Sequence, residues 1–290
     1  MTVSEFKRLP VRAMGRIAPS ALRFLAHRSP VSRGRWPMLS ALLEDGKCRE
    51  WLASLENPTR TRRGFRIFTL PGDLTSDWIK LHGQHETGTE RFILDHLRPA
   101  SAFLDIGANI GYFSLLAAIT GGARVVAFEP QRPIAELLSR SVAHNRVGDR
   151  VRVEQLALSN APATMRMTSC PGNTGHAQLA RPDDAAAQPY PVPVVVLDEW
   201  LAANPVGAVS VCKIDTEGSE VRVLEGMARL LARDGPAIVV EVIGEFLAEF
   251  GASGPGILGM LSDHGYADVT ERYTFHSDRN RYFVKPSRAA

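Results

Sequence analysis

From residue 101 onward, short apolar runs alternate with segments of helical character, and turns rich in glycine or proline separate them. The runs at 102–106, 124–129, 209–215 and 237–243 have the composition of buried parallel strands. Strands that alternate with helices form a mostly parallel sheet with helices on both faces. The sequence therefore predicts an α/β fold of the Rossmann type, in which ligands bind at the carboxyl ends of the strands.

The rest of this region supplies further elements of the same kind. Helices are expected at 112–119, from 133 to about 145, at 219–233 and at 255–264, and further strands at 151–158, 192–197, 266–270 and 282–285. The intervening residues 160–192 are rich in proline, glycine, asparagine and alanine. This composition predicts a loop insertion with room for one hairpin.

The segment Asp105-Ile-Gly-Ala-Asn-Ile-Gly111 forms the turn between the first expected strand and its helix. Gly107 permits backbone angles that a β-carbon forbids and lets the chain approach a ligand closely. Asn109 stands where many nucleotide-binding turns have a second glycine, and asparagine tolerates left-handed conformations. Gly111 allows close packing where the helix begins. Glu129 ends the next strand, where a carboxylate can accept both hydroxyl protons of a ribose.

This turn predicts a cofactor that contains adenosine. The spacing of its glycines distinguishes a dinucleotide from S-adenosylmethionine. A dinucleotide site needs Gly-x-Gly-x-x-Gly to receive a pyrophosphate on helix amides. Here the pattern is Gly-x-x-x-Gly, and Asp105 precedes it. A carboxylate suits a cationic sulfonium and ammonium better than a pyrophosphate. The sequence favours S-adenosylmethionine, and a dehydrogenase is the weaker alternative.

Three blocks, in this order, resemble the FkbM family of S-adenosylmethionine-dependent methyltransferases: Phe103-Leu-Asp-Ile-Gly-Ala-Asn-Ile-Gly-Tyr-Phe-Ser114, Ala127-Phe-Glu-Pro130 and Lys213-Ile-Asp-Thr-Glu-Gly-Ser-Glu220. The likeness covers roughly residues 80–285. It implies a Rossmann-like class I methyltransferase fold, with a mostly parallel seven-stranded sheet whose last strand is antiparallel. It also implies an acceptor among the hydroxyls of sugars and natural products.

The resemblance further implies where the cofactor lies. The first turn would surround its methionine part, Glu129 its ribose and the start of the segment 157–159 its adenine. The loop 173–177 would lie near the active site. The expected cofactor-binding residues are Glu86, Asp105, Gly107, Asn109, Gly111, Glu129, Pro130, Ala157 and Asp215.

Methyl transfer from a sulfonium is an in-line displacement, so an alcohol acceptor must be aligned and must lose its proton. Asp215 ends a central strand and Glu217 begins the next helix, so either could act as general base or bind a hard cation. Alternatively, Asp215 binds the cofactor's amine and Glu217 caps the helix. Glu241 lies in an apolar run, where an unpaired charge is costly. These three residues are the catalytic candidates. No residue is assigned to a metal site, and whether a divalent cation takes part is left open.

Three histidines, His85, His144 and His176, are further candidate bases, although each fits an ordinary surface or loop position. The expected activity is S-adenosylmethionine-dependent O-methylation of a hydroxyl on a sugar, glycan or natural-product small molecule. The alternatives are a nitrogen or carbon acceptor and a catalytically silent protein that binds the cofactor.

Charge divides the chain into two predicted parts. Residues 1–66 carry 14 Lys and Arg against 5 Asp and Glu, whereas residues 67–290 carry 20 against 26. We expect a basic extension that is partly helical or flexible, and a methyltransferase domain at 67–290. An acidic domain is a poor match for nucleic acid, although the extension could contact an anionic membrane surface.

The sequence contains no apolar run long enough to predict a transmembrane segment. The extension lacks the apolar core of a secretory signal, and three widely spaced cysteines favour a reducing compartment. We therefore expect a cytoplasmic protein. The sequence leaves its oligomeric state open.

Overall fold

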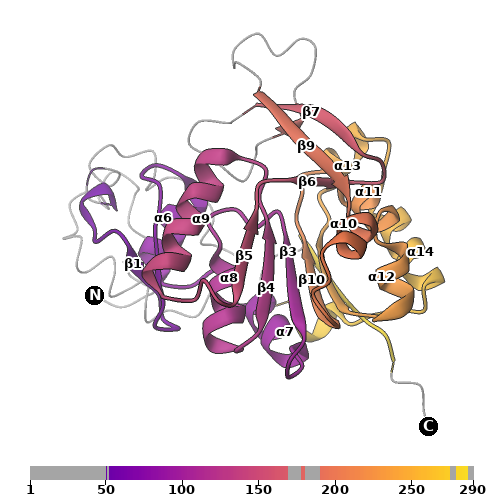
Figure 1. Ribbon diagram of the computed structural model, residues 1–290, viewed down its shortest axis with the longest axis horizontal. Coiled ribbons are helices and arrows are strands. Elements are labelled where there is room, and N and C mark those ends of the chain that lie inside the picture. The colour runs from indigo at the N-terminus through magenta and orange to yellow at the C-terminus, as the bar shows by residue number, and fades with distance from the viewer. Residues whose placement is uncertain (1–49, 51, 169–177, 180–189, 275–278, 287–290) are drawn as a thin grey trace, which may run out of the picture.

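The computed structural model describes residues 50, 52–168, 178–179, 190–274 and 279–286 (Figure 1). Its core is a seven-stranded sheet in the order β12-β13-β11-β10-β3-β4-β5. In chain order these strands are β3 (Ala102–Ile106), β4 (Arg124–Phe128), β5 (Val151–Glu154), β10 (Val209–Ile214), β11 (Ala237–Glu241), β12 (Ala267–Asp268) and β13 (Asn280–Val284).

Neighbouring strands from β11 through β10, β3 and β4 to β5 are parallel, whereas β13 pairs antiparallel with β11. The expected mostly parallel seven-stranded sheet with an antiparallel last strand is therefore confirmed. Every residue of β3, β10 and β11 is buried, because helices cover both faces of these central strands.

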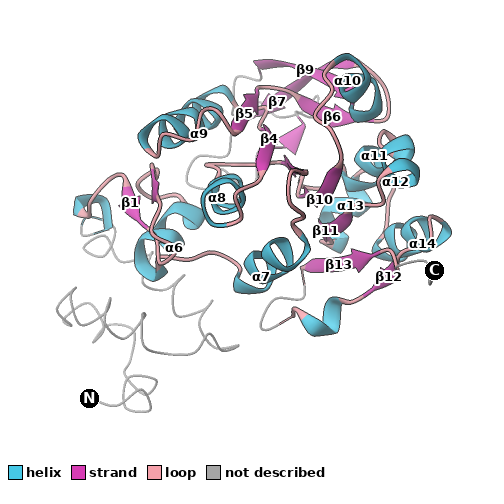
Figure 2. Cartoon of the chain, turned by 60° about the horizontal axis from the view of Figure 1, so that its bottom comes forward, coloured by secondary structure: helices cyan, strands magenta, loops and turns pink. Residues whose placement is uncertain are grey.

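Helices cover both faces of the large sheet (Figure 2). Two apolar clusters fill the space between the sheet and these two helix layers. One face packs against α7 (Thr87–His96), α8 (Tyr112–Leu115) and α9 (Arg132–His144). The other packs against α10 (Leu197–Ala203), α11 (Glu220–Glu225), α12 (Ala228–Arg233), α13 (Gly244–Glu249) and α14 (Gly254–Asp263). Side chains alternate between the two faces along each strand, so Phe103 joins the first cluster and Leu104 the second.

Two of the expected helices are interrupted. The first continues from α8 as a π-helical turn, Leu116–Thr120, closed by a bond from the Gly121 amide to the Leu116 carbonyl. The second, expected at 219–233, divides into α11 and α12 at Gly226. A β-carbon on Gly226 would lie 2.3 Å from the Ser159 carbonyl oxygen, so a contact with another part of the chain sets the break.

The strand expected at 151–158 belongs to two different sheets. β5 ends at Glu154, and β6 (Ala157–Ser159) joins a second sheet in the order β6-β9-β7-β8. Its other strands are β7 (Ala163–Thr168), β8 (Gln178–Leu179) and β9 (Tyr190–Val196). The predicted loop insertion thus contains strands of a four-stranded sheet, which lies beyond the carboxyl ends of β3, β4 and β5 (Figure 1). His176 and the segment 173–177 lie outside the described residues.

A hairpin of β1 (Thr59–Arg60) and β2 (Arg66–Ile67), followed by α6 (Leu74–His82), precedes α7 and was not expected from the sequence. Phe65 and Ile67 are buried in the first cluster. The hairpin crosses residue 66, where we placed the end of the extension. Because residues 1–49 lie outside the described part, the division into 1–66 and 67–290 stays a prediction. Within that described part, no helix combines the length and apolarity needed to cross a bilayer.

Candidate functional site

Four charged side chains lie along the carboxyl edge of the large sheet, on the face covered by α7, α8 and α9. Each stands two positions after a residue of the first apolar cluster and so points to the same face. Asp105 lies in β3, Lys213 in β10 and Glu241 at the end of β11, while Glu129 follows β4. All four are buried. Because three carboxyl groups and one ammonium group gather at this edge of the sheet, it is the candidate site.

The turn after β3 has three residues in the left-handed region: Gly107 (φ 74°), Asn109 (φ 51°) and Gly111 (φ 89°). A β-carbon on Gly107 would lie 1.7 Å from the Asp215 carbonyl oxygen. The turn therefore touches the backbone at the end of β10. The backbone amide of Asn109 donates a hydrogen bond to Glu129 Oε2 at 2.8 Å, so the turn also contacts the end of β4.

Asp105 is fully buried and accepts a hydrogen bond from Ser114 Oγ at 2.6 Å on its Oδ2 atom. Its Oδ1 atom has no hydrogen-bond partner among the described residues. Burial raises the pKa of Asp105, although the nearby Lys213 opposes this effect. An unsatisfied buried carboxylate oxygen is costly unless a ligand binds it. Asp105 thus fits the cationic end of the expected cofactor.

Glu129 accepts backbone hydrogen bonds on both carboxylate oxygens, from the Asn109 amide at 2.8 Å and the Gln131 amide at 2.9 Å. Burial raises its pKa to about 7, and these two hydrogen bonds limit the rise. The amides hold the carboxylate in one orientation, and each of its oxygens can accept one more hydrogen bond. This arrangement fits the two neighbouring hydroxyls of a ribose.

Lys213 belongs to a block that we quoted for the family resemblance, but we had assigned it no role. Its ammonium lies 2.9 Å from Asp215 Oδ2 and donates to the Gly107 carbonyl oxygen at 3.3 Å. Burial disfavours the charged form, but the carboxylates of Asp215 and Asp105 outweigh it and raise the pKa of Lys213. The signal that could have identified Lys213 is a lysine inside the otherwise apolar strand Val209–Ile214, since a buried ammonium needs a partner.

Asp215, Glu217 and Glu241 form a carboxyl cluster whose oxygens lie within 4.8 Å of one another. Burial opposes ionisation of Asp215, but Lys213 holds its pKa below the usual range. Burial and the negative charge of Asp215 raise the pKa of both glutamates. A side-chain hydrogen bond joins Glu241 to Asp215, which requires one of the two carboxyls to hold a proton. The spacing of the oxygens would also fit a hard divalent cation.

Glu220, rather than Glu217, binds the backbone of the turn that follows β10. Its Oε1 atom accepts from the amides of Thr216 and Gly218 and from the Thr216 hydroxyl, at 2.9 to 3.1 Å. Glu217 stands in this turn with φ 54°, and its buried Oε2 has no partner among the described residues. The turn thus presents Glu217 to the cluster and leaves one of its oxygens for another group.

Glu86 and His85 approach the cluster from the start of α7. Glu86 Oε2 accepts from Asn280 Nδ2 at 2.8 Å and from Thr89 Oγ1 at 3.1 Å, while Oε1 lies 3.9 Å from His85 Nε2. The His85 ring packs beside those of Tyr112 and Phe113, whose centroids lie 5.8 and 5.6 Å from its own. The charge of Glu86 acts on both Lys213 and Glu241.

Two other predicted residues lie beside this group, and one lies away from it. Pro130 follows Glu129 directly and precedes α9, and Ala157 begins β6 and packs against the buried pair Met167 and Val192. His144 instead is the last residue of α9, whose first residue follows the carboxyl edge. Its ring packs against that of Phe68, with the two ring centroids 5.8 Å apart.

The part of the chain that matches a known protein family includes most residues of this site. The profile described as the methyltransferase FkbM domain matches residues 105–267, from the first aspartate of the turn to β12. This is more than half of the chain. The chain belongs to this family.

Among the relatives of this FkbM-family methyltransferase is the 31-O-demethyl-FK506 methyltransferase FkbM of Streptomyces tacrolimicus. It is 32% identical over 221 residues, which cover 64% of this chain and 82% of that protein. The methyltransferase sdnD of Sordaria araneosa is 26% identical over 211 residues, 62% and 80% of the two chains. A solved methyltransferase FkbM from Methylobacillus flagellatus KT aligns over 91% of this chain and 65% of its own, with 15% identity and a TM-score of 0.43.

Proposed function

We propose that this methyltransferase uses S-adenosylmethionine to methylate a hydroxyl group of a small molecule or glycan. The observation that carries the proposal is the carboxyl cluster of Asp215, Glu217 and Glu241, which adjoins the turn of Gly107 and contains an aspartate that Lys213 keeps ionised. A hydroxyl differs from a neutral amine in that it must lose a proton to become an effective nucleophile. The relative from Streptomyces tacrolimicus, by its name, also acts on an oxygen.

The residues around the turn fit the cofactor in three parts. The free oxygen of Asp105 faces no partner among the described residues and would bind the ammonium of the methionine part. Glu129, held by two backbone amides, would bind the ribose hydroxyls. Glu86, Gly107, Asn109, Gly111, Pro130, Ala157 and Asp215 complete the proposed set around these contacts.

When bound, S-adenosylmethionine supplies an electrophilic methyl group on its sulfonium sulfur. The carboxyl cluster would take the proton of the acceptor hydroxyl as that oxygen becomes a nucleophile. Because the three carboxyls are coupled, the proton is best assigned to the cluster as a unit. Lys213 keeps Asp215 ionised and therefore keeps at least one acceptor of the proton available. His85 is a further candidate base, beside Glu86.

Isothermal titration calorimetry tests the cofactor assignment. We expect one equivalent of S-adenosylhomocysteine to bind and NAD to show no binding, because the turn offers a carboxylate where a pyrophosphate would need amides. Binding of NAD without S-adenosylhomocysteine would overturn the proposal.

Transfer of a labelled methyl group to paired acceptors that differ only in a hydroxyl or an amine tests the acceptor atom. We expect transfer to the hydroxyl, whereas transfer to the amine alone would favour the nitrogen alternative. Binding without transfer to any acceptor would favour a silent protein. Activity that disappears in EDTA and returns with Mg²⁺ would assign the cluster to a cation.

A second prediction concerns pH and Glu129. The carboxylate accepts ribose hydroxyls best when ionised, and its pKa in the folded protein is about 7. We expect the affinity for S-adenosylhomocysteine to fall as pH decreases below about 7, approaching about 10-fold per pH unit. Glu129→Gln should bind about 10-fold or more weakly at pH 8, because it loses a charge-assisted hydrogen bond. Calorimetry between pH 5.5 and pH 8.5 measures the pH dependence of the affinity and the effect of the substitution.

The Glu129→Gln variant is its own control for other groups that titrate in this pH range. Its affinity should vary less with pH than that of the wild-type protein. Equal pH dependence in the two proteins would contradict the assignment of the ribose to Glu129.

A further inference from the structure

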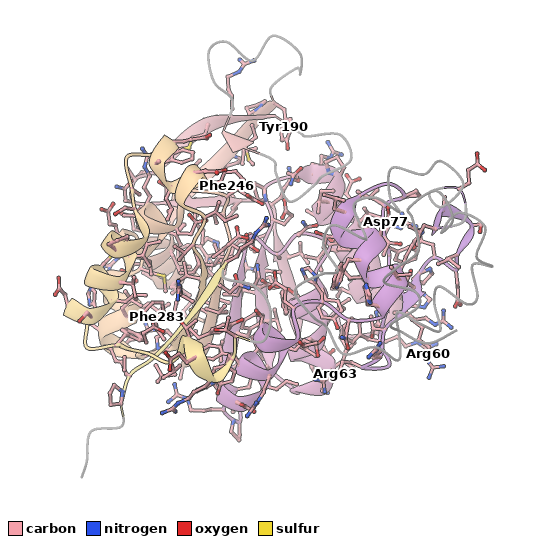
Figure 3. The ribbon with its side chains drawn as sticks, turned by 180° about the vertical axis from the view of Figure 1, so that it is seen from behind. Arg60, Arg63, Asp77, Tyr190, Phe246 and Phe283 are labelled. Atoms are coloured by element: carbon pink, nitrogen blue, oxygen red, sulfur yellow. The ribbon has the colours of Figure 1, made fainter. Side chains whose placement is uncertain are left out.

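The second sheet places one tyrosine against the adenosine side of the candidate site. Tyr190 begins β9, which pairs with β6 through Ala157 and Val194 and with β7 through Met167 and Tyr190 itself. Tyr190 and Ala157 each pack against the same buried pair, Met167 and Val192. Figure 3 labels Tyr190 on this sheet. The tyrosine therefore belongs to the same small apolar cluster as the residue that we expected near the adenine.

The Tyr190 hydroxyl is buried and has no hydrogen-bond partner among the residues that the structure describes. A buried phenol usually finds a partner, so this hydroxyl is available to bond to a ligand. Burial raises the pKa of Tyr190, and the charge of Glu129 adds to this effect. The hydroxyl thus lies close enough to Glu129 to sense its charge, although the two groups belong to different sheets.

We infer that Tyr190 is a cofactor-binding residue, whose ring borders the adenosine end of the cofactor and whose hydroxyl bonds to the nucleoside held by Glu129. This inference rests on the proposed use of S-adenosylmethionine. It makes the second sheet a part of the cofactor site, because Ala157 and Tyr190 reach the nucleoside from β6 and β9. The ligand class of this subsite is a purine nucleoside.

Calorimetry with two probes, S-adenosylhomocysteine and adenosine, tests the inference on the full chain. Tyr190→Phe removes only the hydroxyl and should weaken binding of both probes about 2- to 10-fold, the range of a neutral hydrogen bond. Tyr190→Ala also removes the ring and should weaken both about 10-fold or more, since contact between an aromatic ring and a base is lost.

Tyr266→Phe is the matched control. The Tyr266 hydroxyl is also buried without a partner among the described residues, but the ring belongs to the second apolar cluster, on the other face of the large sheet. Its removal should leave both affinities unchanged. Thermal unfolding and circular dichroism establish that each variant is folded.

The outcomes separate the two proposals. If the wild-type protein binds S-adenosylhomocysteine and Tyr190→Ala binds it within about 2-fold of wild type, the inference on Tyr190 is wrong and the proposed cofactor stands. Weaker binding of S-adenosylhomocysteine with unchanged binding of adenosine would also contradict it. No binding by the wild-type protein would overturn the proposed cofactor and this inference with it.

Discussion

Gly107→Ala should destabilise the protein by about 3 kcal/mol or more, because two separate costs add. The residue has φ 74°, a conformation that costs a residue with a β-carbon on the order of 1 kcal/mol. The added β-carbon would also lie 1.7 Å from the Asp215 carbonyl oxygen. That atom belongs to the backbone at the end of β10, so no side-chain rotation relieves the contact. Chemical denaturation of the two proteins measures the difference.

Gly122→Ala is the matched control for the backbone cost. Gly122 has φ 66° and is exposed, and a β-carbon there would have no atom within 4 Å. Alanine at this position should cost only about 1 kcal/mol. If Gly107→Ala is no less stable than Gly122→Ala, the close approach between the turn and β10 does not exist as described.

Glu241→Gln should leave the fold and cofactor affinity intact while reducing kcat/KM about 10²- to 10⁴-fold. The raised pKa of Glu241 means that the folded protein already holds this carboxyl protonated near neutral pH. Glutamine reproduces its size, its neutral charge and its hydrogen-bond donor toward Asp215. What glutamine cannot do is accept the proton of the acceptor on one oxygen while its own proton passes to the ionised Asp215. Steady-state kinetics and S-adenosylhomocysteine titration of the same preparation measure both effects.

The stability of Glu241→Gln provides an independent test of the protonation. A carboxyl whose pKa is higher in the folded than in the unfolded state is deprotonated first in the unfolded chain, so stability decreases as pH rises above its ordinary range. The wild-type protein should therefore lose stability from pH 6 to pH 9, and Glu241→Gln should lose less. A variant with wild-type activity would contradict a role of Glu241 in proton transfer. Parallel stability curves would contradict its protonation.

The elements that the sequence predicted correctly are those set by local patterns. The apolar runs that become β3, β4, β10 and β11 are each bounded by turns, and their buried composition fits only the centre of a parallel sheet. The turn at Gly107 was also recognisable, because glycine and asparagine supply the left-handed angles that it uses. The seven strands and the antiparallel last strand came from the family resemblance, and the structure supplied the strand order, since local patterns do not determine which strands are neighbours.

Contacts between distant residues account for what was missed. The run at 151–158 divides because β6 pairs with β9, which begins at Tyr190, and nothing in the run itself distinguishes one sheet from two. The helix at 219–233 breaks where Gly226 meets Ser159. A lysine inside a buried strand marks Lys213 as a residue that needs a partner, but only the structure identifies that partner as Asp215. These features depend on partners that lie more than 30 residues away or on exact side-chain placement.

The close contact between Gly107 and Asp215 has a consequence for changing what this protein methylates. The contact joins the turn that would hold the cofactor to the strand end that bears the proposed catalytic carboxyl, so neither can be remodelled without moving the other. Variation at this edge would cost cofactor affinity and turnover together. The strands that flank residues 160–189, β6 and β9, belong to the second sheet and not to this edge. Libraries aimed at new acceptors should therefore vary residues 160–189 and keep β3 and β10 constant.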